Sequence, residues 1–136
     1  MSRFAALIDG RAGAYGAVFP DAPGCTAMGE TIDEALRAAG EALSEWVADE
    51  VAEGRDIPAA RSVEDLSKAP QIAAALQHGA VFAYVPLILN SGRPARANIS
   101  LDAGLLQAID EAAQRAGLTR SAFLASAARE KIEANG

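Results

Sequence analysis

The chain has 136 residues, of which 51% are hydrophobic and 22% are charged, and its formal net charge is −6. This length suits one ordinary domain or two small ones, and it is too short for a barrel enzyme or a doubly wound one. One cysteine, Cys25, and one histidine, His78, exclude an internal disulfide and a cage of soft metal ligands, so we expect no metal and no cofactor.

No run of about 18 uncharged apolar residues occurs, and the segment from Met1 to Leu7 lacks the apolar centre of a signal peptide. We therefore expect a cytoplasmic protein without a membrane partner.

The charge is divided unevenly along the chain. Residues 1–90 hold 6 Lys and Arg against 13 Asp and Glu, a balance of −7, whereas residues 91–136 hold 6 against 5, a balance of +1. This division favours two modules with different partners, although a solvated acidic helix accounts for much of the excess.

Short apolar runs at residues 3–9 and 14–19, separated by a glycine-containing loop, predict a β-hairpin, and residues 25–28 predict a third strand. The segment Thr31-Ile-Asp-Glu34 has the spacing of a capping box and begins an amphipathic helix that Gly54 ends.

The next stretch predicts a helix start at residues 62–65, a short helix over 71–77, and a strand within 80–89 that Pro86 confines to a sheet edge or a strand end. The polar, glycine- and proline-containing segment that follows predicts a linker at residues 90–95. It separates a domain of residues 1–89 from a domain of residues 96–136.

The second predicted domain reads as strand, helix, turn, helix. Residues 95–101 alternate between apolar and polar, Asp102 caps a helix that Gly117 ends, and Thr119 caps the last helix. A single strand has two unpaired edges and so short a chain buries little apolar surface, so we expect two copies to pair their strands antiparallel. The outward side chains would then be suited to reading base edges in the major groove: Arg96, Asn98 and Ser100.

This domain resembles the ribbon-helix-helix repressors in Arg96-Ala-Asn-Ile-Ser-Leu-Asp102, in residues 106–113 and in Gly117-Leu-Thr-Arg-Ser-Ala-Phe-Leu124. The resemblance implies that the outward strand residues contact bases and that the start of the second helix holds a DNA phosphate. By position, the phosphate contacts would come from Thr119, Arg120 and Ser121.

The first domain resembles the HicB antitoxins in Gly16-Ala-Val-Phe-Pro-Asp-Ala-Pro-Gly-Cys25, in Gly29-Glu-Thr-Ile-Asp-Glu-Ala35 and in Ala42-Leu-Ser-Glu-Trp46. The resemblance implies an α+β chain, with a partial ribonuclease H-like domain of antiparallel sheet and helix before the dimeric ribbon-helix-helix domain. It also implies a partner, a HicA-type ribonuclease toxin, whose basic surface the acidic first domain would suit.

A ribonuclease H-like fold raises the possibility of metal-dependent hydrolysis, which needs several converging carboxylates. Asp9 and Asp21 lie at a strand end and in a turn, while Glu34 and Glu41 are typical of a cap and a solvated helix face. No partner residue makes His78 a base, so we expect no enzyme and no catalytic residue.

The leading hypothesis is an antitoxin that occludes a HicA-type mRNA-cleaving toxin and represses its own operon by binding operator DNA as a dimer, with further assembly to a tetramer left open. The alternative is a ribbon-helix-helix repressor whose first domain senses a ligand or drives oligomerisation, without a toxin. The sequence assigns neither the operator nor the toxin-contacting residues.

Overall fold

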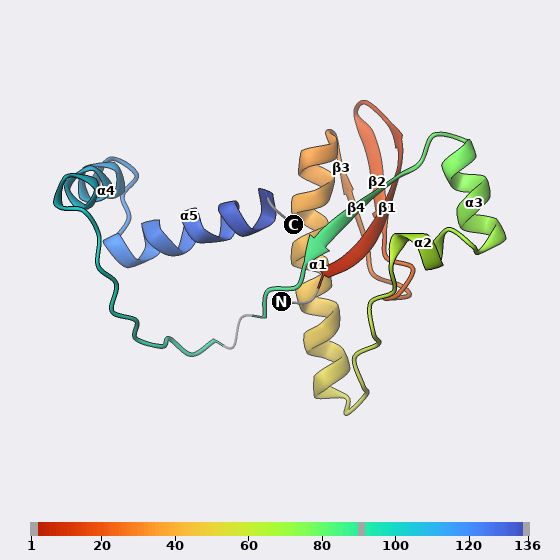
Figure 1. The fold of residues 1–136 in the computed structure, drawn as a ribbon, viewed down its shortest axis with the longest axis horizontal. Helices are drawn as coiled ribbons and strands as arrows, with labels where there is room; N and C mark the ends of the chain where they lie inside the picture. Colours follow the sequence, from red (N-terminus) through yellow and green to blue (C-terminus); the bar gives the residue numbers. More distant parts are fainter. Residues whose placement is uncertain (1–2, 90–91, 135–136) are drawn as a thin grey trace. The chain divides into compact units, whose positions relative to one another are not determined.

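The computed structural model describes residues 3–89 and 92–134, and these fall into two compact units, which we call unit 1 (residues 3–89) and unit 2 (residues 92–134) (Figure 1). Unit 1 carries a sheet and three helices, and unit 2 carries two helices. The α+β class expected from the sequence is confirmed.

The sheet of unit 1 is antiparallel throughout, with the strand order β3-β2-β1-β4. The predicted hairpin is confirmed, with Leu7 opposite Val18 in its register. A β-carbon on Gly10, whose φ is +106°, would collide with the carbonyl oxygen of Ala14, so only glycine fits this strand end. The strands are β1 (Arg3–Arg11), β2 (Ala14–Val18), β3 (Thr26–Gly29) and β4 (Val81–Pro86).

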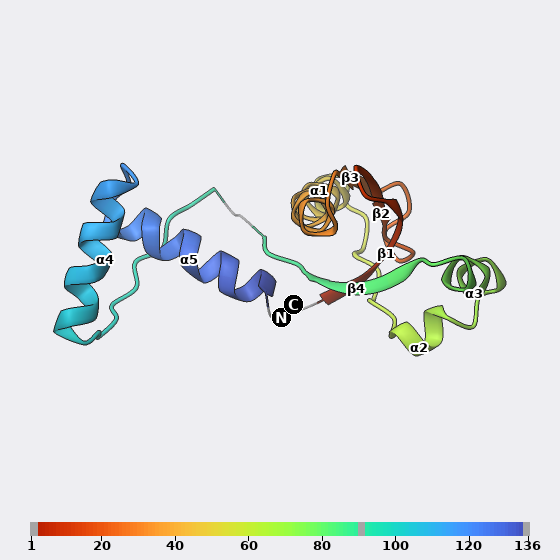
Figure 2. The ribbon, with the colours of Figure 1, turned by 90° about the horizontal axis from the view of Figure 1, so that it is seen from above.

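Helix α1 (Ile32–Ala52) covers one face of this sheet (Figure 2). The hydroxyl of Thr31 accepts a hydrogen bond from the Glu34 amide at 3.1 Å, as the capping pattern predicts. The buried side chains of α1 recur every four residues and pack on alternate residues of β1. This packing forms the main core of unit 1. This core includes Phe4, Ala6, Ile8, Ala39, Leu43 and Val47.

The short helices α2 (Val63–Leu66) and α3 (Pro70–Gln77) form a second, smaller core with the other residues of β1. Leu66 and Ile72 are buried there against Ala5. Because successive strand residues point to opposite faces, β1 is covered on both sides in this region. This explains why residues 4–8 are all apolar rather than alternating.

Strand β4 is shorter than the predicted stretch 80–89 because pairing with β1 ends at Pro86, which lies opposite Arg3. β4 is an edge strand, the position that proline predicts. Beyond it, Leu87 packs against the main core, and the hydroxyl of Ser44 donates to the carbonyl of Ile88 at 2.7 Å.

Unit 2 consists of helices α4 (Ala103–Arg115) and α5 (Arg120–Ala134), preceded by a segment without regular secondary structure. Ile109 and Ala113 on α4 are buried, whereas no residue of α5 is. The strand expected at residues 95–101 does not form within one chain, and residues 92–105 are all exposed. Two helices therefore leave much of the apolar surface of unit 2 uncovered.

Candidate functional site

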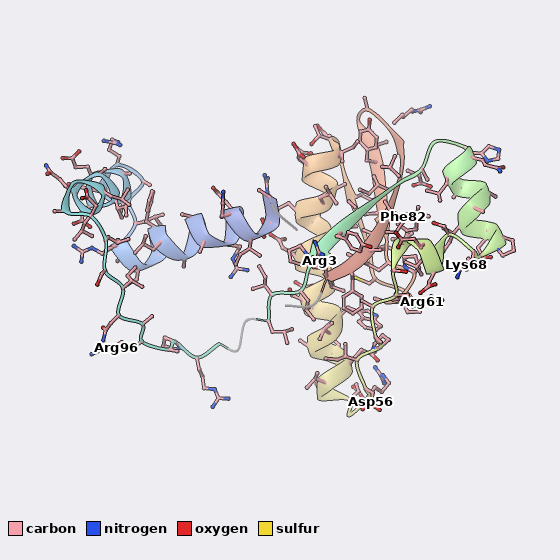
Figure 3. The ribbon with its side chains drawn as sticks, viewed as in Figure 1. Arg3, Asp56, Arg61, Lys68, Phe82 and Arg96 are labelled. Carbon is pink, nitrogen blue, oxygen red and sulfur yellow. The ribbon has the colours of Figure 1, made fainter. Side chains whose placement is uncertain are left out.

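The three predicted base-contacting residues, Arg96, Asn98 and Ser100, lie in the exposed segment before α4. Figure 3 shows Arg96 on this extended stretch of chain. The apolar residues that alternate with them are also exposed, Ile99 by 63% and Leu101 by 37%. Within one chain this segment pairs with no strand of the described residues, so its apolar side chains stay exposed.

The three predicted phosphate-contacting residues lie at the other end of α4, where α5 begins. Gly117 turns the chain with a φ of +70°, and the Leu118 amide donates to the carbonyl of Ala113 at 2.8 Å. The hydroxyl of Thr119 then accepts from the Ala122 amide at 3.1 Å, which makes Thr119 the N-cap that the sequence predicts. The first-turn amides of Arg120 and Ser121 have no acceptor within their own helix, as at any helix start.

The guanidinium of Arg120 is engaged by Asp110 on α4. Nε donates to Oδ1 and Nη2 donates to Oδ2, both at 2.8 Å, so the pair is bidentate. These hydrogen bonds lower the pKa of Asp110 and raise that of Arg120 from their usual values. Sequence reasoning missed Asp110, because its contact depends on how Gly117 folds α5 back onto α4 rather than on any spacing pattern.

In unit 1 the charged residue with the deepest burial is Asp21, at 8% exposure. Its carboxylate accepts from the backbone amide of Arg61 and from Nε of the same residue, each at 2.7 Å. This contact ties the turn after β2 to the chain entering α2, where Figure 3 labels Arg61. The sequence places Asp21 in a turn but contains no signal for the partner, which lies 40 residues away.

Two of the other residues considered for chemistry, Glu34 and His78, have structural partners. The Glu34 carboxylate accepts from the amide of Glu30, and a ring nitrogen of His78 lies 2.7 Å from the carbonyl oxygen of Ala74. Cys25 is buried, and burial together with the nearby charge of Glu45 raises the pKa of its thiol. Within residues 3–89 and 92–134, no three His, Cys, Asp or Glu side chains are grouped as metal ligands.

Trp46 on α1 is half-buried. Its ring packs against the main core, and its indole nitrogen donates to the carbonyl of Pro23 at 3.1 Å.

No helix in the described part of the chain has both the length and the apolar character needed to span a bilayer.

The family model described as the HicB-like antitoxin of bacterial toxin-antitoxin systems matches residues 4–128. The chain belongs to the HicB-like antitoxin family. The match includes nearly all of unit 1 and most of unit 2, so the family applies to the chain as a whole. Among curated protein sequences, none matches this chain.

Solved structures place the HicB-like chain among antitoxins of the same fold. The antitoxin HicB of Burkholderia pseudomallei is 34% identical, with a TM-score of 0.57 over 97% of this chain and 99% of its own. A chain of a HicA3 and HicB3 toxin-antitoxin complex is 19% identical, with a TM-score of 0.53 over 64% of this chain and 99% of its own. A chain of a toxin-antitoxin complex from Streptococcus pneumoniae is 22% identical, with a TM-score of 0.52 over 96% of this chain and 98% of its own.

Proposed function

We propose that this HicB-like antitoxin has two binding activities, one in each unit. Unit 1 binds and occludes a HicA-type mRNA-cleaving toxin, and unit 2 pairs with a second copy to bind operator DNA and repress the antitoxin's own operon. Family membership supports the antitoxin role, and solved toxin-antitoxin complexes of the same fold support a toxin partner.

The observation that carries the DNA-binding half is the alternation in the exposed segment before α4. Ile99 and Leu101 are apolar and exposed, while Asn98 and Ser100 between them are polar. Pairing with the same segment of a second chain would bury the apolar side and turn the polar side outward. A two-stranded ribbon of this kind fits the major groove.

Within such a dimer, the outward side chains of Arg96, Asn98 and Ser100 contact bases, and the start of α5, with Thr119, Arg120 and Ser121, contacts phosphate. An arginine can donate two hydrogen bonds to guanine, and an asparagine can do the same with adenine. Phosphate contacts fix the register of the protein on the duplex without reading its sequence.

Charge supports the assignment of toxin binding to unit 1. Residues 1–90 have a balance of −7, and α1 carries exposed acidic residues along its length. A ribonuclease must attract the RNA backbone, so a basic surface is expected around its active site. Opposite charge speeds association and discriminates against wrong partners. The acidic residues exposed on α1 include Glu34, Glu41, Glu45 and Asp49.

Co-expression with the adjacent small open reading frame tests the toxin half. We expect a complex that elutes together on size exclusion and rescues growth from the toxin expressed alone. A harmless or absent neighbour would instead favour a repressor whose first domain senses a ligand or drives oligomerisation.

Titration of the full chain with the DNA upstream of its own gene tests the proposed DNA binding. Arg96→Ala should cost about 1–3 kcal/mol of binding free energy at the specific site and leave the affinity for unrelated DNA nearly unchanged. An equal loss on both DNAs would contradict base contact by Arg96.

A further inference from the structure

The ion pair between Asp110 and Arg120 lies where the proposed DNA contact is made. We infer that Asp110 lowers the affinity for DNA by competing with a backbone phosphate for the guanidinium of Arg120. This inference rests on the proposed binding of DNA by unit 2, and it makes Asp110 a positioning residue that acts through Arg120.

The geometry of the ion pair shows that Asp110 occupies donors of Arg120 that a phosphate could use. Both carboxylate oxygens of Asp110 accept from Arg120, at 2.8 Å each, in the parallel arrangement that a phosphate would also offer. The guanidinium has five N–H donors, of which this fork uses two. As long as the pair is intact, a phosphate that meets Arg120 also meets the negative charge of Asp110, so the contact adds no net positive charge to the interface.

The ion pair also lies at the start of α5, where the proposed phosphate contact is made. Arg120 is the first residue of α5, and the amides of Arg120 and Ser121 are the donors left at that helix end by the Thr119 cap. A phosphate bound to these amides lies next to the Arg120 side chain. The side chains of Arg120 and Asp110 are 54% and 45% exposed. Exposed ion pairs contribute little free energy, so Arg120 can exchange Asp110 for a phosphate.

Asp110→Asn tests the inference, because asparagine keeps the size of the side chain and removes its charge. The matched control is Glu111→Gln, the adjacent residue on α4, whose carboxylate accepts from the Gln107 side chain at 3.3 Å rather than from Arg120. Both variants, and each combined with Arg120→Ala, are titrated with the upstream DNA at several salt concentrations. Circular dichroism and the solution mass check that each variant remains folded and assembled.

We expect Asp110→Asn to bind DNA roughly two- to fivefold more tightly, the range that corresponds to the energy of an exposed ion pair. The plot of log affinity against log salt should steepen by about 0.9, the value for one more positive charge, no longer neutralised by Asp110, against the phosphates. Glu111→Gln should change neither quantity, and the gain should disappear in the Arg120→Ala background.

The inference is overturned if Asp110→Asn binds no more tightly than the wild type, or if its gain persists without Arg120. Either result leaves the proposed DNA binding intact, since the wild type still binds. If neither the wild type nor any variant shows salt-dependent binding, the proposed function is contradicted and the inference is overturned with it.

Discussion

Single side chains in unit 1 act mainly by fixing irregular segments to the sheet and helix. Asp21 joins the turn after β2 to the chain before α2, and Trp46 donates from α1 to the carbonyl of Pro23 in the same turn. The sequence predicts the turn, because proline and glycine favour it. It does not predict these partners, since contacts across 23 and 40 residues depend on the finished fold.

Asp21→Ala should lower the free energy of unfolding of unit 1 by about 1–3 kcal/mol, because the Arg61 amide loses its acceptor and a buried site loses its hydrogen bonds. Urea unfolding followed by the fluorescence of Trp46, the single tryptophan, measures this loss. The control is Asp56→Ala at an exposed residue (Figure 3), with an expected change within about 0.5 kcal/mol. Equal effects of the two variants would show that the Asp21 contacts do not stabilise the fold.

The Cys25 thiol provides a prediction about pH. Burial raises its pKa in the folded chain, so folding keeps the thiol protonated where the unfolded chain begins to ionise. Its contribution to stability is complete below the unfolded pKa of about 8.5 and is lost as the pH rises through the higher folded value. Ellman's reagent at pH 8 should react slowly with the native chain and rapidly in urea. Rapid reaction of the native chain would show that the thiol is not protected.

At the scale of elements, α1 is the part of unit 1 that the sequence predicts most closely. The capping residue Thr31, the period of the apolar residues and the stop at Gly54 all hold, since each depends on neighbours within a few residues. The sequence predicts the C-terminal end of β4 less closely. Apolar residues continue to Leu89, but Leu87 packs into the core without strand pairing, and an apolar run alone does not distinguish the two arrangements.

Leu43→Ala should destabilise unit 1 by about 2–5 kcal/mol, because Leu43 is fully buried between α1 and the sheet and its removal leaves a cavity. Val51→Ala, near the exposed end of the same helix, should change the stability by no more than about 0.5 kcal/mol. The same fluorescence-monitored urea unfolding compares them. A small loss for Leu43→Ala would mean that α1 is not packed on the sheet as described.

At the scale of the whole molecule, the two units differ in how completely each buries its apolar side chains within one chain. Unit 1 buries a main core and a second, smaller one, whereas unit 2 leaves α5 without a buried residue and exposes Ile99, Leu101, Leu105 and Leu118. The sequence predicts the helices of unit 2 and their caps, which are local features. The pairing of its strand with another copy is a relation between chains, so it stays a prediction here.

The central claim is that unit 2 is completed only by a second copy, and the solution mass tests it most directly. Light scattering on the full chain should give at least about 28 kDa, twice the 14.0 kDa of one chain. Ile99→Lys, which places a charge on the apolar side of the ribbon, should reduce the mass toward that of one chain and abolish DNA binding. Asn98→Ala, on the polar side, should keep the wild-type mass. A wild-type mass of one chain at micromolar concentration, or an Ile99→Lys variant that still assembles and binds DNA like the wild type, would contradict the account.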